Sequence, residues 1–177
     1  MNGLAGPMVI HGPKTQDYDI DLGPVMLSDW FHDYYTDLIE RVFVATETGP
    51  VLPPMADNML IQGKSDYPCG NTTKACAPNA GLAQFKFQSG KKHLIRLVNH
   101  AAEAVIFFSI DKHNLTVISN DFVAVEPYQT DLVVLGVGQR TEVIVEASES
   151  ADTAVWMRIT EGPCKPVLIC PVFLKLS

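Results

Sequence analysis

Short apolar runs separated by turn residues recur along most of the chain. Many of them are rich in Val, Ile and Phe, which favour extended backbone and pack well on a pleated surface. The runs lie at 8–10, 25–27, 85–87, 93–98, 104–110, 115–119, 132–135, 142–147 and 154–159. So many short strands predict an all-β sandwich or barrel.

One stretch has the helical period instead, with apolar residues three or four positions apart. These residues are Trp30, Phe31, Tyr34, Tyr35, Leu38, Ile39 and Val42. Ser28 is placed to cap the N-terminus, and Asp29 in the first turn complements the helix dipole. We predict one short helix whose apolar stripe faces the core. Its polar residues lie mostly on the solvated flank: His32, Asp33, Asp37 and Glu40.

Two further stretches are predicted to be irregular. Segment 45–60 holds three prolines and a glycine, so we expect a long loop there. The sequence GVGQ at 136–139 is similar to a nucleotide-binding glycine loop, but strands flank it and no helix follows. We therefore predict a hairpin turn at this position.

Composition narrows the possible partners. The chain has 177 residues, enough for one good core, and its 47% apolar content argues against disorder. The net charge of −7 disfavours a nucleic-acid partner, and the short basic stretch at 91–96 is interpreted as a solvated strand start. No run of 18 apolar residues exists, so no membrane span is expected, and the N-terminus lacks the pattern of a signal peptide.

Cysteines and glycosylation sequons suggest an extracellular protein. Cys69 and Cys76 lie seven apart between Pro and Gly, and a local disulfide is the preferred interpretation. A zinc site is the alternative, but no histidine is nearby and no second pair has matching spacing. Asn71 and Asn114 each begin an N-glycosylation sequon.

Several segments resemble the middle domain of ascomycete laccases and related multicopper oxidases. They include YDIDLGPVMLSDWFHDYY, DNMLIQGKSDYPC and VWMRITEGPC, and the most specific are SIDKHNLTVISNDFVAVEPY and GVGQR. The resemblance covers roughly residues 3–164, with the segments in the same order. It implies a cupredoxin-like Greek-key β-sandwich with one short helix.

The resemblance also implies a division of the chain and a parent reaction. Residues 1–14 would be the end of a first cupredoxin domain and its linker, 15–164 the second domain, and 165–177 a divergent apolar tail. Full-length members take single electrons from phenolic substrates at one copper and reduce dioxygen to water at a three-copper cluster. Their first and third domains, the expected partners of this one, supply the copper ligands.

The residues of this chain agree with that division of labour. A blue-copper site needs two histidines and a cysteine, yet neither Cys164 nor Cys170 is followed by a histidine. No two of the five histidines are separated by a single residue, as the trinuclear cluster of the family requires. They are His11, His32, His93, His100 and His113. We therefore expect no copper bound to this chain alone and no activity without the neighbouring domains.

Three residues match positions that line the substrate cleft in the family. Asp29 matches an acidic residue that contacts the phenol hydroxyl, where a carboxylate would accept the proton released on oxidation. An Asp that only stabilises the helix start is the alternative. Val105 and Ile106 match an apolar substrate wall, with an ordinary core strand as the alternative.

The tail allows a second hypothesis about function. Its sequence KPVLICPVFLKLS does not match the linker of the family, and its apolar run needs cover. It would either add an edge strand or pair with a second chain and drive association. The competing hypothesis is thus a secreted, non-catalytic binding module derived from a laccase. Neither the partner of Cys164 nor that of Cys170 follows from the sequence.

Overall fold

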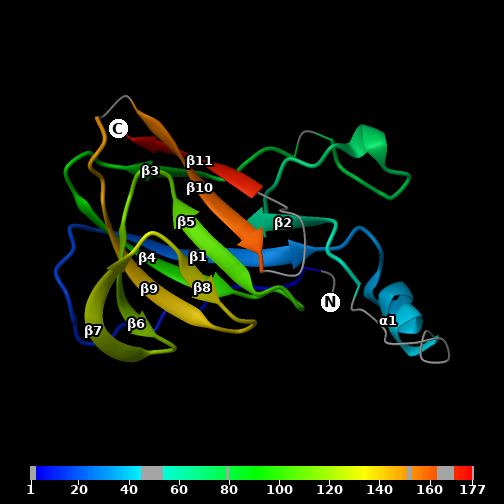
Figure 1. The fold of residues 1–177 in the computed structure, drawn as a ribbon, viewed down its shortest axis with the longest axis horizontal. Helices are drawn as coiled ribbons and strands as arrows, with labels where there is room; N and C mark the ends of the chain where they lie inside the picture. Colours follow the sequence, from blue (N-terminus) through cyan, green and yellow to red (C-terminus); the bar gives the residue numbers. More distant parts are fainter. Residues whose placement is uncertain (1–2, 45–53, 79, 151–152, 163–169, 177) are drawn as a thin grey trace.

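Two β-sheets pack face to face in the computed structural model, which describes residues 3–44, 54–78, 80–150, 153–162 and 170–176 (Figure 1). Sheet A has the strand order β2-β1-β4-β9-β6-β7, and sheet B has the order β3-β11-β10-β5-β8. The strands of sheet A are β1 (Ile20–Trp30), β2 (Asn58–Ile61), β4 (Lys92–Asn99), β6 (Leu115–Asn120), β7 (Val123–Thr130) and β9 (Arg140–Glu146). Those of sheet B are β3 (Gln84–Phe87), β5 (Ile106–Ile110), β8 (Val133–Leu135), β10 (Ala154–Glu161) and β11 (Cys170–Leu176). The described residues also form one α-helix, α1 (Tyr35–Val44), and a short 3₁₀ helix, η2 (Cys69–Asn71).

The core lies between the sheets and follows the two-residue period of the strands. Alternate residues of β4 and β9 point inward, among them Ile95, Leu97 and Val143, and all are fully buried. Sheet B contributes Phe108 and Met157 to the same cluster. This architecture confirms the predicted all-β sandwich.

The connection at 136–139 differs from its prediction. Gln139 N donates to Gly136 O at 3.1 Å, and Gly138 has φ +77°, a left-handed conformation that suits glycine, so a tight turn forms. However, β8 before it pairs with β5 in sheet B, whereas β9 after it pairs with β4 in sheet A. The turn therefore carries the chain from one sheet to the other, and the hairpin prediction is wrong.

The predicted strands are present except at 8–10, where the backbone is irregular. Two strands were missed. Strand β2 occupies the end of the segment predicted as loop, and β7 forms a free edge of sheet A. Because β7 is an edge strand, it tolerates Pro127 and leaves most of its side chains exposed, so it lacks the apolar signal of a buried strand.

Strand β11 comes from the apolar tail and lies inside sheet B. It pairs antiparallel with β10 and parallel with β3, so its backbone has a neighbour on each side. The tail thus adds a strand to the sheet, but the prediction that this strand lies at an edge is wrong. Cys164 lies outside the described residues.

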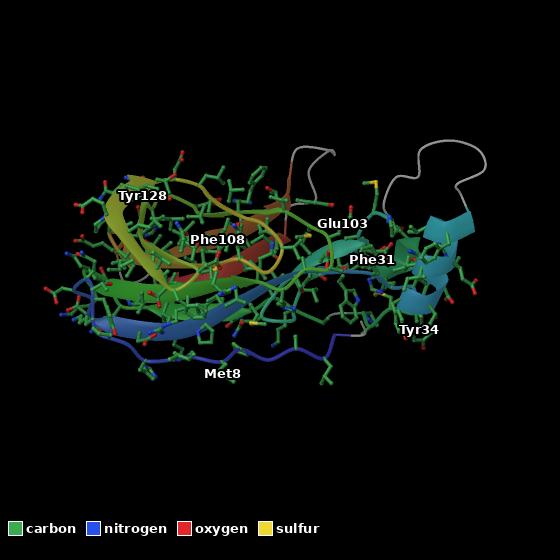
Figure 2. The ribbon with its side chains drawn as sticks, turned by 90° about the horizontal axis from the view of Figure 1, so that it is seen from below. Met8, Phe31, Tyr34, Glu103, Phe108 and Tyr128 are labelled. Carbon is green, nitrogen blue, oxygen red and sulfur yellow. A yellow bond between two sulfur atoms is a disulfide. The ribbon has the colours of Figure 1, made fainter. Side chains whose placement is uncertain are left out.

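The aromatic stretch after position 28 folds differently from its prediction. Ser28, Asp29 and Trp30 complete β1, and α1 begins only at Tyr35. The helix projects from one end of the sandwich, and Figure 2 shows Tyr34 at its start pointing outward. Tyr34 is 70% exposed, and Tyr35 and Ile39 are each 47% exposed, so the predicted core-facing stripe is wrong. The helical period arose from joining the end of a strand to the start of a helix.

The polar residues of this stretch separate into two groups. Asp37 and Glu40 are exposed on α1, as predicted. His32 and Asp33 precede the helix and are half-buried, so for these two the prediction of a solvated helix flank is wrong. None of the described helices has the length and apolar character needed to cross a bilayer.

Candidate functional site

Asp29 lies at the end of β1, opposite Met59 of β2, and only 7% of it is exposed. Its carboxylate accepts three backbone hydrogen bonds. Ala102 N donates to Oδ1 at 2.8 Å, while Glu103 N and Ala104 N donate to Oδ2 at 2.9 and 3.2 Å. Such bonds to an ionised group compensate for the loss of water around it. Asp29 therefore anchors loop 101–104 and does not stabilise the first turn of a helix.

Asn99, at the end of β4, holds the same loop from the other side. It is fully buried, and its Nδ2 donates to Ala104 O at 2.9 Å and to Leu135 O at 3.0 Å. Its Oδ1 accepts from Ala101 N at 2.9 Å. The backbone leading into β5 is thus fixed by two polar side chains from sheet A.

Val105 follows this loop and is presented at the surface, with 40% of it exposed. Its carbonyl accepts from Gly162 N at 2.8 Å, which ties it to the end of β10. Ile106 is fully buried and lies opposite Leu135 and Glu161 in sheet B. Of the two predicted wall residues, Val105 has the exposure needed to contact a ligand, and Ile106 belongs to the core.

His100 lies next to this loop and is half-buried. Burial lowers the pKa of its imidazole, although the nearby charge of Asp29 acts in the opposite direction. Its backbone N donates to Leu27 O at 2.9 Å, which links β4 to β1. The lowered pKa favours the neutral ring beside the loop.

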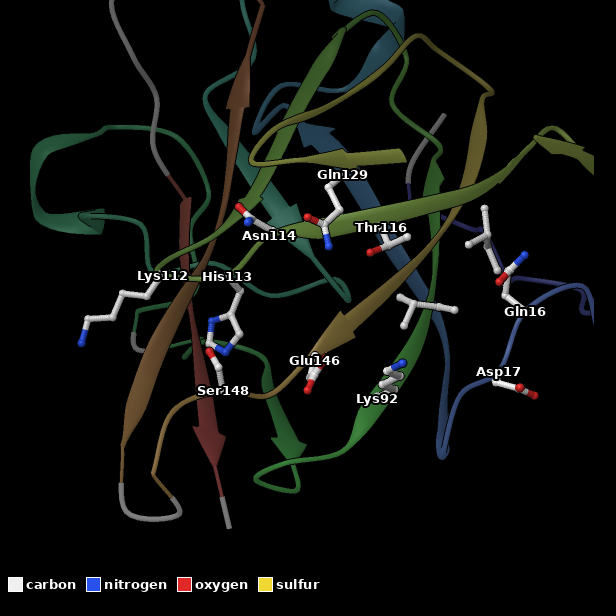
Figure 3. Close-up of a pocket in the computed structure, with 12 residues that line it drawn as sticks. Gln16, Asp17, Lys92, Lys112, His113, Asn114, Thr116, Gln129, Glu146 and Ser148 are labelled. Atoms are coloured by element: carbon white, nitrogen blue, oxygen red, sulfur yellow. The ribbon is translucent and has the colours of Figure 1, made fainter. Parts of the chain in front are cut away.

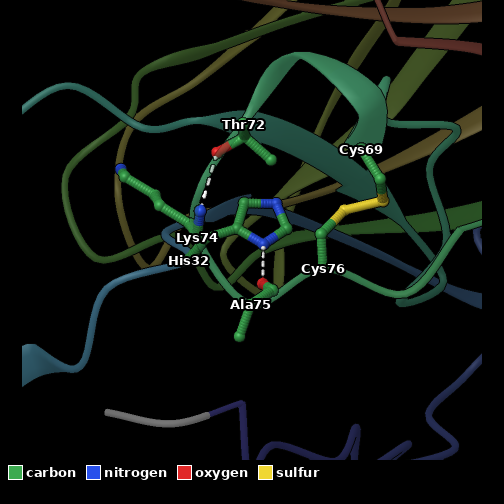
Figure 4. Close-up of a disulfide and its surroundings, with 6 residues drawn as sticks. All are labelled: His32, Cys69, Thr72, Lys74, Ala75 and Cys76. Carbon is green, nitrogen blue, oxygen red and sulfur yellow. Dashed lines mark hydrogen bonds between the residues drawn. A yellow bond between two sulfur atoms is a disulfide. The ribbon is translucent and has the colours of Figure 1, made fainter.

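A disulfide between Cys69 and Cys76 closes the loop that covers His32 (Figure 4). His32 Nδ1 lies 2.9 Å from Ala75 O, and its ring centroid lies 4.4 Å from that of Tyr67. Lys74 N donates to Thr72 Oγ1 at 3.1 Å within the same loop. His32 is thus engaged in loop packing.

Lys74 joins this loop to two acidic residues near the start of α1. Its Nζ donates to both oxygens of Asp57, at 2.7 and 2.9 Å, and lies 3.2 Å from Asp33 Oδ2. Burial alone would raise the pKa of Asp57, but the hydrogen bonds from Lys74 and from His32 N outweigh it and lower that pKa. The bond to Asp57 in turn raises the pKa of Lys74.

The described side chains do not fit the ligand set of a copper site. In the part of the chain that the structure describes, no three His, Cys, Asp or Glu side chains are grouped closely enough to share a metal ion. His93, for example, is buried against Phe87, and its Nε2 accepts from Gln88 N at 3.0 Å. A blue-copper centre needs two histidines and a thiolate in one place. No copper site is therefore assigned to these residues.

Two residues that fix these loops, Asn99 and Asp57, were missed in the sequence. Asn99 ends an apolar strand, and a polar side chain at that point is a signal for a buried bond to the next loop. Asp57 and Lys74 are 17 positions apart, and no pattern between them predicts the contact. The first residue could therefore have been found from the sequence, whereas the second needed the fold.

Comparison with known proteins places the chain in a family. The sequence model of the multicopper oxidases matches residues 21–168. The chain is 43% identical over 166 residues to oxidoreductase OpS5 of Beauveria bassiana, covering 93% of this chain and 27% of that protein. It is 39% identical over 158 residues to laccase-2 of Botryotinia fuckeliana, covering 89% of this chain and 26% of that laccase.

Solved structures give the same result for the fold. A mutant of the laccase from Botrytis aclada superposes with a TM-score of 0.83 at 32% identity, covering 97% of this chain and 32% of that one. The laccase from the same fungus without that mutation gives a TM-score of 0.79. The chain belongs to the multicopper oxidase family and has its cupredoxin-like fold. It spans about a quarter of the length of the curated relatives that it matches.

Proposed function

We propose that this chain acts as the middle cupredoxin-like domain, residues 15–164, of a laccase-type oxidase. The parent reaction is the one-electron oxidation of phenolic compounds coupled to reduction of dioxygen to water. The observation that carries the proposal is the similarity to laccases over nearly the whole chain but only a quarter to a third of their length. Copper would be held by first and third domains, with this domain as scaffold and cleft wall.

Within that proposal, Val105 supplies the cleft wall. It is exposed and stands on a loop whose backbone is fixed by Asp29 and Asn99, as a binding surface requires. The role of Asp29 as substrate proton acceptor stays a prediction. Three amides already bind its carboxylate, and this geometry favours a structural role.

The wall is tested by substitution in the complete oxidase. Val105→Ala is expected to raise KM for phenols several-fold with little change in kcat, because it removes ground-state contact. Val134→Ala changes another exposed valine, on β8, and should alter neither constant. Equal kinetics for both variants would overturn the role of Val105.

Copper analysis tests the division of labour between domains. The isolated chain is expected to purify without stoichiometric copper and without phenol turnover. Elemental analysis and a phenol-oxidation assay measure both, and copper with turnover would overturn the proposal.

Secretion is part of the proposal. The disulfide suits an oxidising compartment, and both sequon asparagines, Asn71 and Asn114, are exposed. The alternative is a secreted binding module that holds a partner through the former substrate face or through residues 165–177, and it was motivated by an apolar tail in need of cover. Strand β11 has backbone neighbours on both sides, so that motivation is weakened.

A further inference from the structure

A hollow of about 390 Å³ lies on the outer face of sheet A (Figure 3), and Val105 is not among the residues that line it. Its floor includes Ile118 of β6 and Ile144 of β9, which are almost fully buried. Amide and hydroxyl side chains surround them, namely Gln16, Asn114, Thr116, Gln129 and Ser148. The volume is at the lower end of the range for small-molecule sites, about 300–1,000 Å³.

Three of the residues that line the hollow lie side by side on neighbouring strands of sheet A. Thr116 of β6 lies opposite Gln129 of β7 and opposite Ile144 of β9. Directly opposed residues share a face of the sheet, with their Cβ atoms about 5 Å apart. Ile118 lies where the register of β6 is irregular, between Val117 and Ser119, and lines the same hollow. An aliphatic floor and a polar rim therefore follow from the fold.

The charged groups around the hollow balance one another. Lys92 and Glu146 lie opposite each other on β4 and β9. Lys112 lies 3.5 Å from Glu149, and Asp17 lies 3.2 Å from Lys14. Because each charge has an opposite one near it, the hollow favours a neutral ligand over an anion or a cation.

His113 provides a buried acceptor in this wall. Only 6% of the residue is exposed, and its Nδ1 lies 2.8 Å from Asp111 O, so in the neutral ring Nδ1 carries the proton and donates. Nε2 then accepts, and this enclosed atom has no hydrogen-bond partner among the described residues. Because it is enclosed, a ligand in the hollow would bind chiefly through the amide and hydroxyl side chains that surround the hollow.

Carbohydrate has the chemistry that these features select. A sugar is neutral, carries hydroxyl groups that donate and accept around its edge, and presents apolar C–H faces. Asn114 stands on the rim, is exposed, and begins the sequon whose third residue is Thr116 of β6. We propose that the hollow binds the first sugars of an N-linked glycan attached to Asn114. This proposal rests on the secretion proposed above, because N-linked glycans are added in the secretory pathway.

The two sequons of the chain provide an internal comparison. Asn71 is also exposed but lies in the disulfide-closed loop, outside the hollow.

To test the proposal, the chain is expressed in a yeast secretory host and treated, still folded, with an endoglycosidase that cuts between the first two sugars. Mass spectrometry of the peptides follows each site. We expect release at Asn114 to be about tenfold slower than at Asn71, since only the undocked fraction is cleaved, and denaturation should remove the difference.

A substitution in the rim separates docking from local backbone effects. Gln129→Ala removes one hydrogen-bonding side chain and is expected to speed release at Asn114 about fivefold. Gln84→Ala removes another exposed glutamine, from β3 at an edge of sheet B, and should leave the rate unchanged. This comparison uses Asn114 alone, so it does not depend on occupancy at Asn71.

Three results would overturn the proposal: no glycan on Asn114, equal native rates at the two sites, or equal rates for Gln129→Ala and the unsubstituted chain. None of them bears on copper or phenol oxidation. Failure of the glycan-binding proposal is therefore distinguishable from failure of the laccase-domain function.

Discussion

At the scale of single residues, the buried polar groups near β1 fix loops that are distant in sequence. Asp29 binds amides 73 to 75 positions away, and Asn99 reaches Leu135. A buried group of this kind is costly to remove because its partners lose their bonds without regaining water. These residues therefore set the shape of the surface that carries Val105.

Removing the carboxylate of Asp29 tests this role. Asp29→Ala is expected to lower the free energy of unfolding by about 2–3 kcal/mol, since Ala104 N is left buried without an acceptor. Asp29→Asn keeps one acceptor oxygen and should lower the free energy of unfolding by less than Asp29→Ala does. Urea unfolding measures both. Asp37→Ala, at an exposed acid on α1, should stay within about 0.5 kcal/mol of the unsubstituted chain, and an equal midpoint for Asp29→Ala and Asp37→Ala would contradict the structural role.

The bond between Asp57 and Lys74 predicts a dependence of stability on pH. The folded-state pKa of Asp57 is lowered, so its stabilisation is complete above the unfolded value of about 3.9 and is lost as pH falls through the folded value. Asp57→Asn should therefore destabilise the chain at about pH 7, and this destabilisation should shrink as the pH falls below the unfolded value of about 3.9. The effect is measured as the difference in urea midpoint between the unsubstituted chain and Asp57→Asn over this pH range. A difference that stays constant with pH would mean that the charge of Asp57 does not contribute to stability.

The sequence could identify Asp29 as important but could not give it the right partners. An acidic residue next to an aromatic stretch is visible locally, whereas loop 101–104 meets it only through the pairing of β1 with β4. Ile106 and Val105 were inseparable for a similar reason, because neighbouring strand residues face opposite sides and the sequence does not say which side is core.

At the scale of elements, strands with a compact run of apolar, β-branched residues were predictable and those without one were not. Strand β9 holds the continuous run Val143, Ile144 and Val145, and such a run predicts it. Strand β7 leaves Val123 and Tyr128 exposed on a sheet edge and packs only Val125 partly against the core, so its apolar signal is weak. The helical period predicted from Trp30 to Val42 joins the end of β1 to α1, which shows that two adjacent elements can together imitate one period.

The disulfide between Cys69 and Cys76 should stabilise mainly the loop that it closes. Replacing Cys69 and Cys76 by Ser frees a loop of seven-residue separation, which is expected to cost about 2 kcal/mol by loop entropy. Lys74 lies inside that loop, so tryptic cleavage after it should become faster while the sandwich core stays resistant. Unfolding and limited proteolysis measure the two effects, and cleavage spread evenly over the chain would contradict a local role.

At the scale of the whole molecule, one sandwich takes strands from both ends of the described chain. Strand β1 starts at Ile20 and pairs in parallel with β4, while β11 ends at Leu176 and pairs in parallel with β3. The tail therefore belongs to the same folding unit as the segments that resemble laccases. Its sequence does not match the linker that the resemblance implies, although the family model extends to residue 168, and its apolar run supplies what a strand inside a sheet needs.

A chain that ends after Glu161 tests this role of the tail. Strand β3 has β11 as its one partner in sheet B among the described strands, so removing β11 would leave β3 unpaired and the edge of β10 open. We expect the shortened chain to lose cooperative unfolding and to aggregate, because open strand edges pair with other chains. Light scattering and circular dichroism measure both. Deleting 1–13 removes a similar length whose described residues are mostly exposed, and that variant should remain a folded monomer. If the tail instead drove association from outside the sandwich, the chain ending after Glu161 would be the better-behaved monomer and the full chain would be the one that associates.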